Sequence, residues 1–274
     1  MEKIISRSNP VCVHMRKLAK SKTYRYEHNQ FICDGIKLLE EALSSSVKID
    51  IVLTTKNLDY NFSDDTCVYL INEAIADSIS PLQTSQGLLF VCSIPDVSLC
   101  DYNTGTHILL DNIQDPGNVG TIIRSAFAFG IKSLILTGGT ADIWNPKTLR
   151  ASMGAVFNLH IAVKNCDEII ELKNNGVRFI GTASDQSSVD IKSADFSDSI
   201  IILGNEGQGI SKELHSLCDE IVTIPLSPGC ESINVAIAAA IIMWEANHPV
   251  LAGPPSLAKE GKVGCDSQIR ITMI

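Results

Sequence analysis

The stretch that decides the fold reads Ile200-Ile201-Ile202-Leu203-Gly204-Asn205-Glu206-Gly207-Gln208-Gly209-Ile210-Ser211. Four consecutive apolar residues predict a short strand that is buried on both faces, as strands of parallel sheets are. Glycines follow the strand at once. In parallel sheets, ligands bind in the loops beyond the carboxyl ends of the strands. The stretch therefore predicts a buried parallel strand that leads into a ligand-binding loop.

The composition of this loop indicates which ligands it does not bind. It nearly matches the phosphate-binding pattern of two glycines five residues apart followed by Lys and Ser, but Ile210 stands at the lysine position. Glu206 would also repel a phosphate, and the glycine order differs from the dinucleotide fingerprint. We therefore expect a ligand other than a nucleotide polyphosphate. A plain glycine-rich turn is the alternative interpretation.

Strand and helix patterns alternate on both sides of this stretch. Because such alternation produces parallel strands joined by helices, we expect an α/β domain over residues 107–248, with a mostly parallel sheet covered by helices on both faces. The expected strands are 107–111, 133–137, 178–182, 200–204 and 220–225, and the expected helices are 119–129, 146–156, 167–174, 211–218 and 233–245.

Residues 1–95 form a second, smaller predicted domain. Helical spacing is found over residues 11–19 and, more clearly, over 30–44, and short buried strands are indicated at 49–54 and 88–93. Residues 96–106 are polar and contain a glycine, which predicts a linker. The last segment, residues 249–274, contains Gly253-Pro254-Pro255 and is expected to be a flexible tail.

A second candidate loop follows the first strand of the larger domain. It reads Asp115-Pro116-Gly117-Asn118-Val119-Gly120, in which Pro and Gly favour a tight turn and Asn118 is a good N-cap for the next helix. Arg124 lies one to two turns into that helix among apolar residues, so its guanidinium needs an anion or another hydrogen-bonding partner. A structural ion pair at the helix start is the alternative.

A third candidate loop, Ile224-Pro225-Leu226 to Val235, opens the last predicted helix. Ser232 is a fair N-cap, and Asn234 in the first turn can reach a neighbouring loop. The alanines that follow are suited to close helix packing. An ordinary capped helix is the alternative interpretation here.

Composition excludes several classes of protein. The 274 residues are 45% hydrophobic and 19% charged, which excludes general disorder. No run of eighteen apolar residues and no signal-peptide segment occurs, so we expect a soluble cytoplasmic protein without a membrane segment. The nine scattered cysteines are typical of a reducing compartment. The six histidines show no metal-ligand spacing, and a Gly-x-Ser-x-Gly elbow is absent, so neither a metal site nor a hydrolase triad is expected.

The net charge of −9 is unevenly distributed. Residues 1–56 carry ten Lys and Arg against six Asp and Glu, and a local field, rather than the overall charge, decides phosphate binding. A solvated helix face is the alternative. The sequence therefore offers a candidate RNA-docking cluster, which consists of Arg7, Arg16, Lys17, Lys20 and Arg25.

Together, the three loops closely resemble the motifs of the SpoU (TrmH-like) branch of the SPOUT RNA methyltransferases. The first motif of that family, Asn-x-Gly-x-x-x-Arg, matches Asn118 to Arg124. The second, Gly-Asn-Glu-Gly-x-Gly, matches Gly204 to Gly209, and the third matches residues 224–226 and 232–235. The first domain is similar to the L30e-like substrate-binding domain of the family, although Asp34 stands where relatives usually carry Glu.

The resemblance implies a trefoil-knotted catalytic domain, an obligate homodimer and S-adenosylmethionine as cofactor. It assigns seven residues to the cofactor site: Thr182, Leu203, Gly204, Asn205, Ile224, Leu226 and Ile233. It implies methylation of a ribose 2′-hydroxyl in RNA, with ribosomal RNA favoured as the substrate and tRNA second.

The family gives a central part to its motif-one arginine, here Arg124. It either clamps a phosphate or acts as the base, and we favour the clamp because guanidinium stays protonated. The remaining catalytic candidates, which would orient Arg124 and the substrate, are Asn118, Glu206, Ser232 and Asn234. Two alternatives are a non-catalytic RNA-binding protein with the same fold, which would need none of these side chains, and a dinucleotide-dependent oxidoreductase, which lacks its glycine fingerprint.

Overall fold

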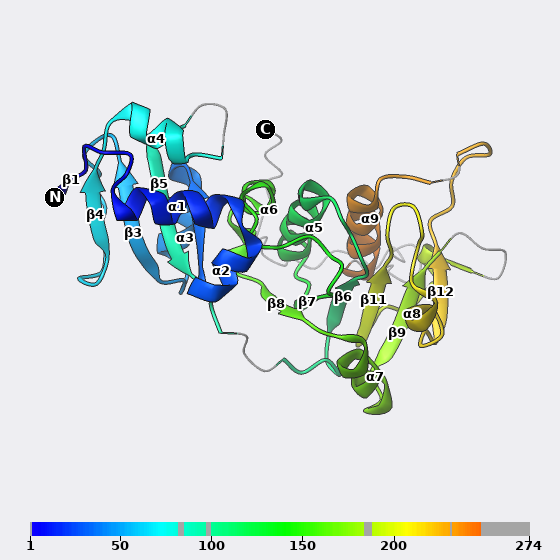
Figure 1. The fold of residues 1–274 in the computed structure, drawn as a ribbon. Coiled ribbons are helices and arrows are strands. Elements are labelled where there is room, and N and C mark those ends of the chain that lie inside the picture. The colour runs from blue at the N-terminus through cyan, green and yellow to red at the C-terminus, as the bar shows by residue number, and fades with distance from the viewer. Residues whose placement is uncertain (1, 82–84, 97–99, 184–187, 231, 248–274) are drawn as a thin grey trace, which may run out of the picture.

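The computed structural model of the chain describes residues 2–81, 85–96, 100–183, 188–230 and 232–247. These residues form two sheets, one of five strands near the amino terminus and one of seven strands in the rest of the chain (Figure 1). The predicted tail lies outside the described residues, as do parts of the predicted linker. Among the described residues, no helix has both the length and the apolar character needed to cross a membrane.

The amino-terminal unit consists of a mixed sheet with helices on both faces. Its elements are β1 (Glu2–Lys3), α1 (Pro10–Lys20), α2 (Lys22–His28), β2 (Gln30–Asp34), α3 (Ile36–Ser44), β3 (Ile49–Thr54), β4 (Cys67–Leu70), α4 (Glu73–Ile79) and β5 (Leu88–Ser93). The strand order is β1-β4-β3-β5-β2. β5 runs antiparallel to its neighbours β2 and β3, whereas β1, β4 and β3 run parallel.

The helix predicted over residues 30–44 is wrong at its first five positions. Residues 30–34 form β2, which pairs along its whole length with β5. Gly35 then adopts a φ of +109°, which is accessible to glycine, and α3 begins at Ile36. The helical spacing predicts a helix correctly only from residue 36 onward. Residues 30–34 are extended because they pair with β5, a strand distant in sequence.

The larger unit alternates strands and helices as predicted, although the strands at residues 160–163 and 189–190 were not expected from the sequence. Its elements are β6 (Thr106–Leu110), α5 (Pro116–Ala128), β7 (Ser133–Leu136), α6 (Pro146–Ser152), the 3₁₀ turn η1 (Ala155–Phe157), β8 (His160–Val163), α7 (Cys166–Asn174), β9 (Arg178–Thr182), β10 (Val189–Asp190), the 3₁₀ turn η2 (Ile191–Ser193), β11 (Ser199–Leu203), α8 (Lys212–His215), β12 (Glu220–Thr223) and α9 (Val235–Asn247).

The seven strands are parallel throughout, in the order β10-β12-β9-β11-β6-β7-β8. Alternate residues of β6 and β11 point to opposite faces, as the period of two requires. Ile108 and Ile201 pack toward α5 and α9, whereas Leu109 and Ile202 pack toward α7 and α8. The predicted α/β architecture, with helices on both faces of a mostly parallel sheet, is confirmed.

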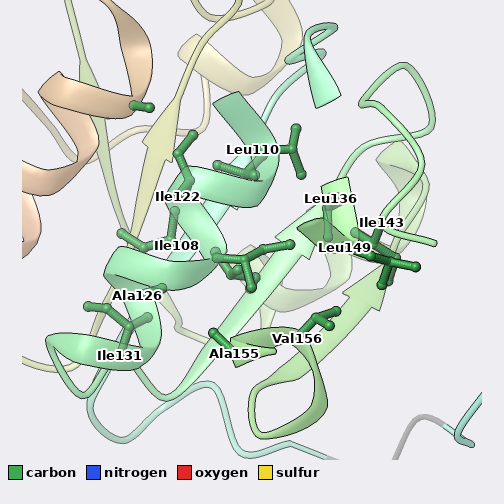
Figure 2. Packing of buried hydrophobic residues seen from close by; sticks show 14 of the residues in the cluster. Ile108, Leu110, Ile122, Ala126, Ile131, Leu136, Ile143, Leu149, Ala155 and Val156 are labelled. Atoms are coloured by element: carbon green, nitrogen blue, oxygen red, sulfur yellow. The ribbon is translucent and has the colours of Figure 1, made fainter. Parts of the chain in front are cut away.

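Close packing of α5 on the sheet and on α6 orders the start of the first candidate loop. Figure 2 shows Ile122 and Ala126 of α5 next to Ile108 and Leu110 of β6. A Cβ atom on Gly120 would lie 2.4 Å from the Thr148 carbonyl oxygen and 2.6 Å from the Ala151 Cβ. Glycine is therefore needed at this position because the backbones of α5 and α6 approach too closely for any side chain.

We expect Gly120→Ala to lower the free energy of unfolding by about 1–3 kcal/mol, because the added methyl group forces α5 and α6 apart. Urea denaturation followed by circular dichroism measures this change. Gly138→Ala is the matched control, since a Cβ there has no atom within 4 Å, and its effect should stay within about 0.5 kcal/mol. Equal stability of both variants would contradict this account of the α5–α6 contact.

Candidate functional site

The first loop is anchored by an acidic N-cap. The Asp115 side chain accepts hydrogen bonds from the backbone N–H groups of Gly117 (2.7 Å) and Asn118 (3.0 Å), and Pro116 occupies the first helical position. The prediction that Asn118 caps this helix is therefore wrong, because α5 begins two residues before Asn118. The side chain of Asn118 is thus available for contacts with other loops. Lys147 of α6 binds Asp115 at 2.8 Å and holds the pKa of that carboxyl below its usual range.

The glycine-rich loop after β11 is folded tightly upon itself. Asn205 and Gly209 exchange two backbone hydrogen bonds of 2.9 Å, and Gly209 adopts a φ of +70°. The Asn205 side chain accepts from the N–H groups of Gly207 and Gln208. A Cβ atom on Gly204 would lie 2.2 Å from backbone atoms of Gly209 and Ile210. The loop is thus a defined compact turn, and glycine at position 204 is required for its closure.

Two hydrogen bonds join this loop to the end of the neighbouring strand β6. The Asp111 carboxylate, which is 5% exposed, accepts from the backbone N–H of Ser211 at 2.7 Å. Asn205 donates through its side chain to the Asn112 carbonyl at 2.8 Å. Because β6 and β11 are adjacent and parallel, the loops that follow them start side by side at one edge of the sheet. The two hydrogen bonds fix the position of one loop relative to the other.

The third loop ends where α9 begins, at Val235. Asn234 accepts from the backbone N–H groups of Ala236 (2.9 Å) and Ile237 (3.3 Å) and so caps the helix. The prediction that Ser232 is the N-cap is therefore wrong, because the helix starts two residues later than expected. Ser232 is exposed and lines the cleft described below.

Asn118 connects all three loops by its side chain. Its amide nitrogen donates to Glu206 Oε1 at 2.8 Å, and its amide oxygen accepts from Asn234 Nδ2 at 3.1 Å. A side-chain amide carries a donor nitrogen and an acceptor oxygen on the same carbon, so one side chain can serve both partners. The structure thus brings together three of the predicted catalytic residues, one from each motif.

A cleft of about 250 Å³ opens between these loops. Thr182 of β9 lies on its wall and donates a hydrogen bond to the Ile202 carbonyl at 2.9 Å. Glu206 and Ser232 also line this cleft. So do all seven residues predicted for the cofactor site, namely Thr182, Leu203, Gly204, Asn205, Ile224, Leu226 and Ile233.

The lining of the cleft favours an apolar, cationic ligand. Leu203, Ile224 and Leu226 present aliphatic surface that can enclose a planar ring. Among the described lining residues there is no Lys or Arg, and Glu206 is the one carboxylate. A polyphosphate would find no counter-charge here, whereas a ligand with positive charge and a heterocycle would fit.

Arg124 stands apart from the hydrogen-bonded side chains. It is exposed on α5, six residues after Asn118 and so about 9 Å further along the helix axis. Within the described part of the chain it makes no hydrogen bond or ion pair. The alternative that it forms a structural ion pair is thus wrong for this structure, and the prediction that the other four candidates orient it remains untested.

The predicted RNA-docking cluster is only partly available. Arg25 is 3% exposed and ion-paired with Asp142 at 2.6 Å, so its assignment to RNA is wrong. Arg16 donates to the Arg7 carbonyl and to Ser78, which holds it along the protein surface. Lys17 and Lys20 are exposed, as is the neighbouring Lys22 in α2.

The structural roles of three residues at the site were not predicted from the sequence. Asp115 and Pro116 form the usual pair of an acidic N-cap followed by proline, and this signal could have placed the helix start correctly. Asp111 bonds to a residue one hundred positions away, and nothing in the local pattern indicates that contact.

Comparison with protein-family models gives two matches. Residues 105–244 match the SpoU rRNA Methylase family, and residues 9–89 match the MRM3-like substrate binding domain. The first match contains all three loops, and the second covers most of the amino-terminal sheet.

Individual proteins agree with these matches. The chain is 34% identical to the 23S rRNA (guanosine(2553)-2′-O)-methyltransferase RlmP of Bacillus subtilis, over 89% of this chain and 98% of that protein. A structure of an AdoMet-bound rRNA methyltransferase from Sinorhizobium meliloti is 29% identical, with a TM-score of 0.81, and the match covers 92% of this chain and 99% of that one. The methyltransferase AviRb of Streptomyces viridochromogenes, at 24% identity and a TM-score of 0.79 over 90% of this chain and all of that one, shares the fold. The chain belongs to the SpoU rRNA methylase family.

Proposed function

We propose that this protein transfers a methyl group from S-adenosylmethionine to a ribose 2′-hydroxyl of ribosomal RNA. The observation that carries the proposal is the Asn234–Asn118–Glu206 hydrogen-bond chain, which joins three loops beside an apolar cleft without a basic side chain. A scaffold protein would have no need of this arrangement. The names of two relatives, the 23S rRNA methyltransferase RlmP and the rRNA methyltransferase of Sinorhizobium meliloti, support ribosomal RNA over tRNA.

The residues of the cleft fit the cofactor. Leu203, Ile224 and Leu226 would enclose the adenine ring, and Glu206 would face the positive charge. When bound, the cofactor supplies an electrophilic methyl group. The trefoil knot implied by the family resemblance remains a prediction, supported by the way residues from 203–209, 222–226 and 232–235 line one cleft.

Arg124 supplies the contact to RNA in this proposal. An exposed guanidinium without a protein partner is suited to bind a phosphate through two parallel hydrogen bonds. Such a clamp holds the ribose in line with the methyl donor, and alignment is the main task when the donor is already reactive. Burial or an acidic neighbour would instead indicate a structural role, and Arg124 has neither among the described residues.

The amino-terminal unit would dock the RNA. Its exposed Lys17, Lys20 and Lys22 lie close together in sequence on α1 and α2, and they offer a positive surface in a chain whose net charge is −9. We place the reaction in the cytoplasm, a proposal supported by the free thiols of all eight cysteines in the described residues.

A second copy of the chain would complete the catalytic unit. α9 is apolar on nearly all sides, and its outer face leaves Ile237 56% and Trp244 48% exposed, with the Trp244 ring edge-on against Phe129 at the end of α5. The groove between these helices, of about 540 Å³, also contains Asn118 and Asn234. Helices of this kind are normally buried. We therefore propose a homodimer that is formed through α5 and α9 and adjoins the cofactor cleft.

Arg124→Ala should reduce methyl transfer to ribosomal RNA by about 10²–10³-fold, because one preorganised charged donor is lost. The affinity for S-adenosylmethionine should change little, since Arg124 does not line the cleft. Transfer of a tritiated methyl group measures the first quantity, and isothermal titration measures the second. Arg124→Lys keeps the positive charge but cannot donate two parallel hydrogen bonds to one phosphate, so it should retain part of the activity.

Full activity of Arg124→Ala would contradict the clamp. Absence of both cofactor binding and transfer in the parent protein would contradict the proposed function itself. Methyl transfer to tRNA with none to ribosomal RNA would contradict the proposed substrate but not the proposed reaction.

The proposed dimer predicts that the parent protein sediments at twice the mass of one chain. Ile237→Glu should shift it to a monomer, because a carboxylate would be buried in the α9 interface. Ile5→Glu is the control, since Ile5 is 79% exposed and lies in the amino-terminal unit. Sedimentation velocity checks both variants, and a monomeric parent protein would contradict the proposed interface.

A further inference from the structure

The two units share one apolar core. Phe31 and Cys33 of β2 face the same cluster as the core of the larger sheet, whereas Ile32 between them faces α1 and α4. The ring of Phe31 stacks on Trp144 with centroids 4.3 Å apart. Units joined by a polar linker alone are expected to move relative to one another, and an extensive apolar contact removes that freedom. Apolar packing is not directional, however, and does not by itself set one orientation.

A buried ion pair at the same junction is directional. Arg25 of α2 donates from Nε (3.0 Å) and Nη2 (2.6 Å) to Asp142 Oδ2, and from Nη1 to the Leu18 carbonyl at 2.7 Å. Arg25 is 3% exposed, and Asp142 is 5% exposed. Tyr26 donates to Asp142 Oδ1 at 3.2 Å. Burial and the neighbouring Asp142 raise the pKa of Tyr26, so its phenol remains a donor.

Asp142 is itself held in place by α6, the helix that packs against α5, and by the residues just before it. Its carboxylate accepts from the Trp144 backbone N–H at 3.1 Å, and its carbonyl accepts from the Thr148 hydroxyl at 2.9 Å. Thr148 belongs to α6, whose backbone touches α5 at Gly120. A continuous set of contacts therefore runs from Arg25 through α6 to α5, the helix that carries Arg124.

Buried ion pairs contribute little net stability, because desolvation offsets their attraction, but they tolerate few geometries. A buried ion pair at this junction therefore favours a role in orientation. We propose that Arg25 and Asp142 are positioning residues, which fix the RNA-docking unit relative to Arg124 so that one nucleotide of the bound RNA reaches the cofactor cleft. This inference rests on the proposed function and names the feature that selects the methylated site.

The test uses the whole 274-residue chain and ribosomal RNA. The variants are Arg25→Met, Arg25→Lys and the double variant Arg25→Met/Asp142→Asn, which leaves no buried charge without a partner. Total methyl transfer gives kcat and KM, primer extension maps the methylated nucleotides, and titration with S-adenosylmethionine counts the folded sites. The Lys17→Ala/Lys20→Ala/Lys22→Ala variant serves as the comparison for docking.

Both Arg25→Met and the double variant should lose about 10²-fold in kcat, as expected for a small misplacement of the reacting groups. Methylation should also spread to neighbouring nucleotides. The KM for RNA and the affinity for the cofactor should stay near parent values, because the lysines and the cleft are untouched. Arg25→Lys should recover part of kcat and of the fidelity. The triple lysine variant should show the opposite split, with a raised KM and an unchanged methylation map.

Unchanged kcat and a single methylated nucleotide in the double variant would overturn the inference, even if Arg25→Met alone fails to fold. A loss of activity that merely follows the loss of cofactor-binding sites would also overturn it, since it would indicate a role in stability alone. A parent protein that methylates no RNA would contradict the proposed function first. A parent that methylates normally and a double variant that keeps its fidelity would contradict the positioning role only.

Discussion

The site depends on the two hydrogen bonds of the Asn118 side chain. One end of the amide binds a carboxylate in the loop after β11, and the other end binds an amide at the start of α9. These segments lie far apart in sequence and have no shared backbone pairing among the described residues. Aspartate at position 118 would offer only acceptors and would repel Glu206, so the network requires an amide. The cleft lies where these three segments meet.

The rest of the fold serves to bring these segments within reach. Burial of β6 and β11 side by side in the sheet places their loops at one edge, and the Asp111–Ser211 bond fixes them at the same level. Close backbone approaches at Gly120 and Gly204 leave no room for side chains. The cleft is lined by aliphatic side chains and a single carboxylate, while exposed lysines gather on α1 and α2. This separation of charge suits a cationic cofactor in one place and an RNA backbone in another.

Local patterns in the sequence were sufficient for much of this arrangement. The alternation of apolar strands and helices predicted the larger sheet, and all the residues assigned to the cofactor site line one cleft. The errors arose where distant contacts decide the structure. Residues 30–34 form a strand because they pair with β5. Arg25 is buried because it pairs with Asp142, which lies 117 positions further along the chain. Asn118 and Ser232 are not the N-caps that the sequence predicted, because Asp115 caps α5 and the Asn234 side chain caps α9.

The most direct test of this account is a double-mutant cycle on S-adenosylmethionine binding with Asn118→Ala, Glu206→Ala and the two combined. Calorimetric titration gives the dissociation constants. A hydrogen bond to a charged group contributes about 1.5–3 kcal/mol, so each single change should weaken binding by about tenfold or more. The combined change should weaken it little further, because either change breaks the same network. Fully additive losses, or unaltered binding in both single variants, would contradict the claim that Asn118 assembles the site.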